Sequence, residues 1–171
     1  MTLILKRSEL AKDFDEAPTV IATGGDDRRL AVVKQNGADH VVNVTREDAV
    51  DAVKRITNGH GAHYVLECSG APNAVNDAMK MLNRGGRICL AAFPQEPVPV
   101  DVAYLVRNNI YVFGIRGEGK SATRRAASLI AQKRFSPKLI HTHTFSFDEV
   151  PAAIRQARER IDDAIKVVVK M

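Results

Sequence analysis

The sequence predicts an α/β fold with a doubly wound, mostly parallel sheet that helices cover on both faces. Short β-branched runs alternate with longer amphipathic segments along the 171 residues, and this alternation is typical of parallel strands joined by crossover helices. The hydrophobic fraction of 45% and the charged fraction of 26% are ordinary for a globular chain. A chain of this length can also bury a sizeable core.

Each expected strand is a short apolar run that ends at a glycine, an asparagine or another polar turn residue. Residues 1–6 can supply a central strand ahead of the others. The remaining strands of this sheet are expected at 19–24, 40–44, 63–70, 87–93 and 109–115. Because crossovers between parallel strands are right-handed, these strands should form a doubly wound sheet.

Segments with apolar residues at helical spacing connect these strands. Thr45 is expected to be the N-cap of one helix, with Asp48 as an acid in its first turn. A later helix carries an apolar stripe that includes Leu82 and should stop at Gly85-Gly86. The helices of this part are expected at 8–17, 26–35, 45–59 and 72–84.

The character of the chain changes after Gly119. A basic amphipathic helix is followed by a half-exposed strand, a second amphipathic helix and a closing apolar strand. We therefore expect residues 1–119 to form the main domain, with 1–18 as an atypical first strand and helix. Residues 120–171 should form a small α/β segment at the C-terminus.

Composition argues against several classes of function. The net charge of +5 arises from Lys and Arg that are interspersed with acids, so we expect no nucleic-acid binding. No apolar run approaches the length of a membrane span, and a cytoplasmic location is expected. Cys68 and Cys89 lie in apolar runs and are expected to be buried, reduced thiols. His141 and His143 could begin a metal site, but no third ligand is evident, so no metal site is expected.

Four stretches, in this order and spacing, carry a resemblance to a known family. They are VIATGGDDRRLAVVKQNGADHVVNV, VLECSGAPNAVNDAMKMLNRGGRICLAAF, NNIYVFGIRG and the tail FSFDEVPAAIRQA…AIKVVV. Together they resemble the C-terminal part of zinc-type medium-chain alcohol and polyol dehydrogenases, in the sorbitol, butanediol, threonine and erythritol dehydrogenase branch. The resemblance runs from Thr19 to Met171. It implies a Rossmann-like nucleotide-binding domain and an oxidoreductase that transfers hydride between a secondary alcohol and NAD or NADP.

The chain departs from that family in two ways. No glycine lies between Met1 and Thr23, where the family has a glycine-rich turn that lets backbone N–H groups approach the pyrophosphate. A weakened cofactor site is expected, in which Lys6 and Arg7 either contact phosphate by charge or merely complete the sheet. The family's catalytic domain precedes the nucleotide domain, so this chain supplies no catalytic residue and no zinc ligand. Turnover by this chain alone is not expected.

The resemblance implies cofactor contacts from several strand ends. Each of several residues also has a plainer interpretation: Asp26 as a helix cap, Gly70 as a tight turn, Ala92 and Phe93 as core, and Lys166 as a solvated lysine. The choice between NAD and NADP stays open. The implied contacts are Thr23, Gly24, Asp26 and Arg28 near the adenine ribose, Ser69 and Gly70 at the next strand, Ala92, Phe93, Ile115 and Arg116 near the nicotinamide, and Lys166 near the pyrophosphate.

The resemblance also implies a homodimer through residues 109–115, whose exposed apolar edge needs pairing or protection. A separate chain could supply the catalytic domain. Two other hypotheses remain beside the dehydrogenase portion: a non-catalytic module for NAD(P) sensing or dimerisation, and a truncated remnant without a function.

Overall fold

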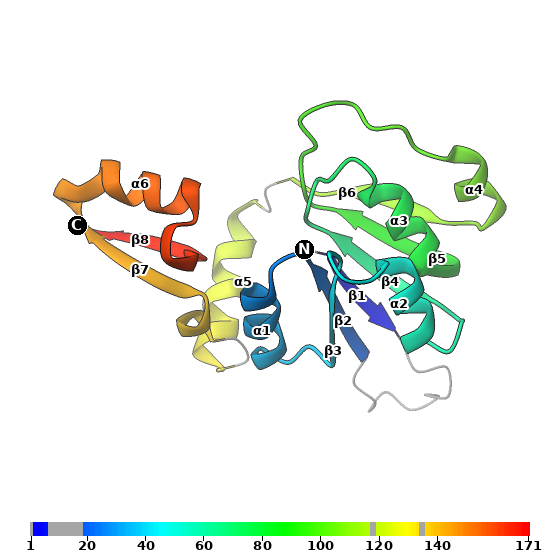
Figure 1. Ribbon diagram of the computed structural model, residues 1–171, viewed down its shortest axis with the longest axis horizontal. Coiled ribbons are helices and arrows are strands. Elements are labelled where there is room, and N and C mark those ends of the chain that lie inside the picture. The colour runs from blue at the N-terminus through cyan, green and yellow to red at the C-terminus, as the bar shows by residue number, and fades with distance from the viewer. Residues whose placement is uncertain (1, 7–18, 117–118, 134–135) are drawn as a thin grey trace. The chain divides into compact units, whose positions relative to one another are not determined.

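The computed structural model describes residues 2–6, 19–116, 119–133 and 136–171. The chain divides into two compact units, Met1–Gly117 and Glu118–Met171. Each unit is described separately below, with its elements labelled in Figure 1.

The first unit contains a sheet in the order β3-β2-β1-β4-β5-β6. All neighbouring strands in it run parallel except for β1, which is antiparallel to both β2 and β4. The α/β fold with a mostly parallel sheet is therefore confirmed. The strands are β1 (Thr2–Lys6), β2 (Thr19–Gly24), β3 (His40–Asn43), β4 (Ala62–Glu67), β5 (Leu82–Leu90) and β6 (Tyr111–Gly114).

The central strand β1 occupies the expected place but runs in the reverse direction. Thr2 pairs with Thr23 and Glu67, at the carboxyl ends of β2 and β4, whereas Lys6 pairs with Thr19 at the start of β2. The hypothesis that Lys6 contacts a phosphate at the carboxyl edge is therefore wrong, because Lys6 lies at the opposite edge of the sheet. The companion expectations for Arg7 and for the helix at 8–17 fall outside the described residues.

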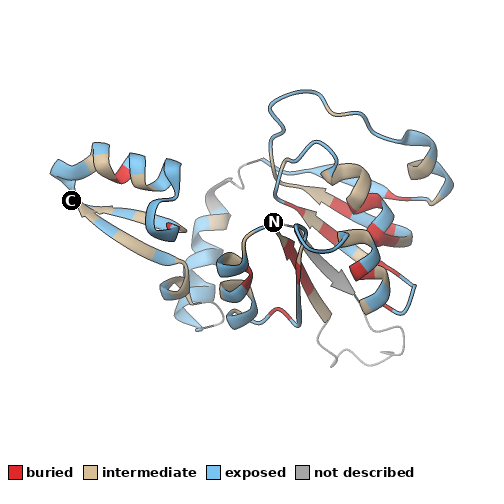
Figure 2. Cartoon of the chain, viewed as in Figure 1, coloured by how far each residue is buried: buried red, intermediate tan, exposed pale blue. Residues whose placement is uncertain are grey.

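Helices cover both faces of this sheet. Ile21 and Ala22 are adjacent in β2 and point to opposite faces, yet both are fully buried. Helix α1 packs on β2 and β3, while α2 and α3 pack against each other, and Figure 2 shows buried residues concentrated between these layers. The helices are α1 (Asp27–Gln35), α2 (Ala49–Ile56), α3 (Ala74–Met81) and α4 (Val102–Arg107).

Three local expectations need correction. The N-cap of α2 is Asp48, whose carboxylate accepts from two backbone N–H groups, while Thr45 is held in a turn by its bonds to Asn43. Helix α3 ends at Met81, because Leu82 already pairs with Ala62 and begins β5. Helix α4 was not expected: Asp101 caps it from a segment that the sequence pattern indicates as a loop.

The second unit is a small α/β arrangement. Its two strands, β7 (His141–Ser146) and β8 (Lys166–Lys170), pair in parallel, and α6 (Val150–Glu159) packs against both. Ser146 and Glu149 form a capping box ahead of α6. The remaining elements are α5 (Gly119–Ala131) and three short 3₁₀ helices, Pro137–Leu139, Phe147–Glu149 and Ile161–Asp163.

Candidate functional site

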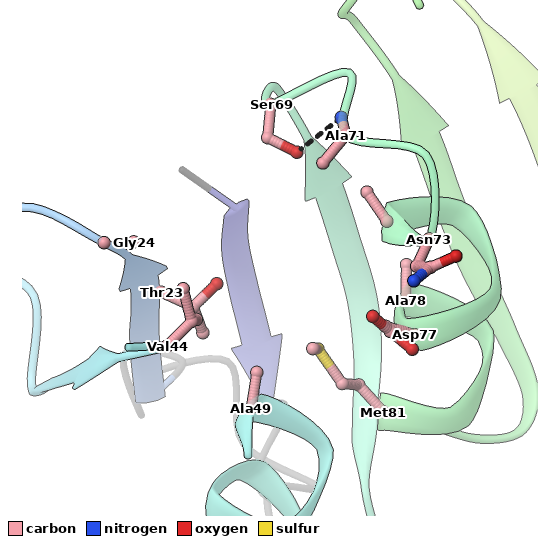
Figure 3. Close-up of a pocket in the computed structure, with 12 residues that line it drawn as sticks. Thr23, Gly24, Val44, Ala49, Ser69, Ala71, Asn73, Asp77, Ala78 and Met81 are labelled. Carbon is pink, nitrogen blue, oxygen red and sulfur yellow. Dashed lines mark hydrogen bonds between the residues drawn. The ribbon is translucent and has the colours of Figure 1, made fainter. Parts of the chain in front are cut away.

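A cavity of about 250 Å³ lies at the carboxyl ends of β2 and β4. Ligands of open α/β sheets bind at this edge, outside the carboxyl ends of the strands. Figure 3 shows the cavity between β2 on one side and α3 with the loop after β4 on the other. It is lined by Thr23, Gly24, Gly25, Val44, Ala49, Ser69, Ala71, Asn73, Ala74, Asp77, Ala78 and Met81.

The wall formed by β2 is compact because its residues are small. Thr23 is buried, and Gly24 ends the strand with no side chain between the backbone and the cavity. Opposite, α3 projects the carboxylate of Asp77 and the thioether of Met81 towards the same space (Figure 3). The site therefore combines an apolar floor with a few polar groups at its rim, as small-molecule sites commonly do.

The turn after β4 is organised by the buried carboxylate of Glu67, which is only 2% exposed. Its Oε1 accepts hydrogen bonds from the backbone N–H of Ser69 at 2.6 Å and from the Ser69 hydroxyl, and its Oε2 accepts from the N–H of Gly70 at 3.1 Å. The Ser69 hydroxyl oxygen in turn accepts from the N–H of Ala71. Glu67 thus fixes the segment from which Ser69 and Ala71 line the cavity.

Sequence reasoning missed Glu67. A signal was present, since an acid inside the apolar run VLECSG must either be exposed or find hydrogen-bond donors. The Ser-Gly pair that follows supplies those donors.

The acids after β2 serve the helix and the loops around it. The side chain of Asp26 accepts from the N–H of Arg29 at 3.1 Å, so it is the N-cap of α1. Asp27 accepts from Asn43 and forms an ion pair with Arg46. The structure thus shows the capping role of Asp26, while Arg28 lies in the first turn of the same helix.

Gly70 and Ala92 line a second cavity rather than the first, and Ala71 lines both. Phe93 is 70% exposed, which excludes the core alternative for this residue. The Arg116 guanidinium lies over its ring, 5.8 Å from the centroid, and the N–H of Ile115 donates to the Leu90 carbonyl. These residues cluster beyond the carboxyl ends of β5 and β6.

The remaining candidate residues are a lysine of the second unit and two thiols of the first. Lys166 is an exposed residue of β8 in the second unit. The expectation of two buried thiols is wrong: Cys68 is exposed and Cys89 is half-buried. Cys68 lies directly after the last residue of β4 and is therefore outside the buried strand. Partial burial and the nearby Glu67 carboxylate still raise the pKa of the Cys68 thiol.

The described ranges contain no group of three or more His, Cys, Asp or Glu side chains that could hold a metal ion. These residues therefore do not fit a catalytic zinc, which needs three protein ligands. Among the helices of the same residues, none is long and apolar enough to cross a membrane.

Comparison with known proteins places this geometry in a family. Residues 8–132 match the family described as zinc-binding dehydrogenase. Over 93% of this chain, the sequence is 29% identical to sorbitol dehydrogenase of Bacillus subtilis. Over 78% of this chain, it is 34% identical to L-threonine 3-dehydrogenase of Bacillus licheniformis. These alignments cover only 45% and 39% of the two relatives.

Solved structures agree. The benzyl alcohol dehydrogenase of Acinetobacter calcoaceticus superposes with a TM-score of 0.78 at 28% identity, over 88% of this chain and 42% of that enzyme. The chain thus spans less than half the length of the relatives that it matches. The matched family, the relatives and the shared fold lead to one conclusion: this chain belongs to the zinc-binding dehydrogenase family.

Proposed function

We propose that this chain is the cofactor-binding portion of an alcohol or polyol dehydrogenase-type oxidoreductase, with a weakened site for NAD or NADP. The carrying observation is the cavity at the carboxyl ends of β2 and β4, built from Thr23, Gly24 and Ser69. Its volume of about 250 Å³ is below the roughly 300–1,000 Å³ of a typical ligand site. It therefore suits the adenosine half of a dinucleotide rather than the whole molecule.

The reversed β1 is the reason to propose weak binding. In a dinucleotide-binding unit the first strand leads at its carboxyl end into a glycine-rich turn, and the next helix directs its N-terminus at the pyrophosphate. Here the carboxyl end of β1 lies at the other edge of the sheet. β1 therefore does not lead at its carboxyl end into the edge where the pyrophosphate would lie. Most of the affinity must come from the adenosine half.

The ribose end of the site lacks the feature that selects NAD. An acid at the end of the second strand normally accepts bonds from the ribose hydroxyls, but Gly24 stands there, and Asp26 is engaged as a helix cap. Arg28 and Arg29 follow in the first turn of α1, and arginine near this position accommodates the 2′-phosphate of NADP. We therefore propose that NADP binds at least as well as NAD.

Calorimetric titration with NAD⁺, NADP⁺ and adenosine tests the site. We expect dissociation constants near the millimolar range, which corresponds to about −4 kcal/mol of binding free energy. Asn73 lines the cavity and makes no capping bond, so Asn73→Phe should block all three ligands without unfolding α3. Lys80→Phe, which places the same ring on the outer surface of α3, should bind like the wild type. Absence of heat with every ligand would overturn the proposal.

No turnover is proposed for this chain alone. The described residues offer no fit for the family's zinc, so a separate chain with a catalytic domain would have to supply it. Assays with sorbitol, erythritol, butanediol and threonine should show no reduction of NAD⁺ or NADP⁺. Zinc analysis of the purified protein should find less than one equivalent. Turnover by the isolated chain would contradict this part of the proposal.

A second candidate function is a non-catalytic module for NAD(P) sensing or dimerisation. The reversed β1 favours it, because β1 does not end at the edge where a pyrophosphate would lie. Strand β6 is an edge of the sheet, and Tyr111 and Phe113 on it are about half exposed. An exposed apolar edge strand can pair with a second copy, so we propose a homodimer through residues 109–115. Sedimentation analysis should find a dimer that Phe113→Lys dissociates. Val106→Lys on the exposed side of α4 should leave it intact, and a wild-type monomer would refute the dimer.

A further inference from the structure

The second cavity of the first unit lies between α3, α4 and the segment that joins β5 to α4. Its volume is about 180 Å³. The lining is almost entirely apolar, with Val75, Leu90, Val98, Val100, Leu105 and Val112 forming most of it. None of the lining residues that the structure describes is a cation. The charged residue among them, Glu67, directs both carboxylate oxygens at the 69–70 turn.

The segment that covers this cavity is stiff. Residues 94–100 contain three prolines, whose rings restrict the backbone. Asn76 of α3 holds the segment at both of its polar atoms: its amide donates to the Pro99 carbonyl at 3.0 Å, and its carbonyl accepts from the N–H of Asp101 at 3.0 Å. Asp101 then caps α4 through the N–H of Tyr104 at 2.8 Å.

On its other side, the cavity is bounded by a close glycine contact. Gly70 has a φ of +67°, and a β-carbon there would lie 3.2 Å from the Phe93 carbonyl oxygen and 3.4 Å from the Ala92 β-carbon. The chain can therefore bring the 69–71 turn against the end of β5 only with glycine at this position. Both ends are thus fixed by local covalent and hydrogen-bond constraints, so the space cannot easily collapse.

A fixed apolar space has a definite ligand chemistry. An apolar cavity of about 150 Å³ stays dry and binds benzene or xenon in other proteins. The present cavity is slightly larger and mostly apolar, with Glu67 in its lining and part of it open to solvent. An anion would lose its hydration there without meeting a cation among the described lining residues, which is strongly unfavourable.

We propose that this cavity is a binding site for a small, neutral, apolar molecule of about the size of a single aromatic ring. The site is separate from the proposed adenosine cavity, and the 69–71 turn forms the wall between them, with Ala71 exposed to both. It does not depend on cofactor binding.

Titration with benzene, monitored by two-dimensional amide NMR of the full chain, tests the site. Benzene should saturate at one equivalent and shift amides of residues 69–71 and 94–105, and sodium benzoate should bind at least about tenfold more weakly, a loss of about 1.4 kcal/mol. Val98→Phe places a ring inside the cavity and should abolish the benzene shifts. Val102→Phe adds the same ring on α4, where Val102 is 62% exposed and lines neither cavity, and should bind like the wild type.

A second filling variant, Val100→Phe, keeps the test decisive if Val98→Phe fails to fold. Spectra of both variants establish whether the fold is retained. The proposal is overturned if the wild type shows no saturable shifts, if benzoate binds as well as benzene, or if a folded filling variant responds as the wild type does. Adenosine should not compete with benzene, so failure of this site and failure of the cofactor site are separate outcomes.

Discussion

Replacing Glu67 tests whether one buried carboxylate organises the edge that carries both cavities. Glu67→Ala removes the acceptor of two backbone N–H groups and of the Ser69 hydroxyl. The hydroxyl can turn to water, but the two N–H groups lie in a part-buried turn. At about 1.5 kcal/mol for each bond to a charged acceptor, the variant should lose about 3 kcal/mol of unfolding free energy. Ser69→Ala removes only the hydroxyl and should lose about 1 kcal/mol.

Tyrosine fluorescence during urea unfolding measures this loss in the right part of the molecule. All three tyrosines, Tyr64, Tyr104 and Tyr111, lie in the first unit, so the signal follows that unit alone. This matters because a single unfolding free energy is poorly defined for a chain with two units. A Glu67→Ala variant within about 0.5 kcal/mol of the wild type, the range of ordinary surface substitutions, would refute the assigned role.

Four further predictions follow from local geometry. Asp48→Ala should cost about 1 kcal/mol by removing the cap of α2, measured by the same fluorescence assay, whereas Thr45→Ala should cost less; equal effects would contradict the assignment of the cap. Gly61→Ala should destabilise far more than Gly59→Ala, because both have positive φ but only at Gly61 would the new β-carbon lie 2.8 Å from the Leu82 backbone; similar thermal midpoints for the two variants would count against this. Gly24→Asp should restore an acceptor for the ribose hydroxyls and lower the dissociation constant for NAD⁺ about tenfold, the value of one charged hydrogen bond of about 1.4 kcal/mol. The same variant should bind NADP⁺ more weakly than the wild type. If calorimetry showed both affinities changing in the same direction, the proposed role of this position would be wrong. In a Cys89→Ser background, alkylation of Cys68 by iodoacetamide should reach half its maximal rate at a higher pH than in an unfolded control, because the raised pKa of Cys68 keeps the unreactive thiol protonated; a lower midpoint would show that the shift has the opposite sign.

Several site assignments show where local sequence patterns stop being informative. Thr23 and Ser69 lie at one edge because β2 and β4 run in the same direction, each antiparallel to β1. The alternation of strands and helices predicts that common direction. The choice between Asp26 as a helix cap and as a ribose contact depends on where α1 begins. The helix begins directly after Asp26, whose carboxylate accepts from the Arg29 N–H. Likewise, Asp48 rather than Thr45 caps α2, because both the N–H and the hydroxyl of Thr45 donate to the Asn43 side chain.

The sequence by itself determined the alternation of strands and helices and the mostly parallel sheet, because hydrophobic periodicity and glycine placement are local properties. The dehydrogenase family was indicated by resemblance to known sequences and is confirmed by the family match. Only the tertiary structure decided the direction of β1 and the burial of Glu67. The run TLILK has its apolar residues at the centre, so its hydrophobic pattern is the same in both directions of the chain. The pattern alone therefore cannot orient a central strand. Its orientation is set by pairing with β2 and β4, and that pairing puts the carboxyl end of β1 at the edge opposite the one where a pyrophosphate would lie.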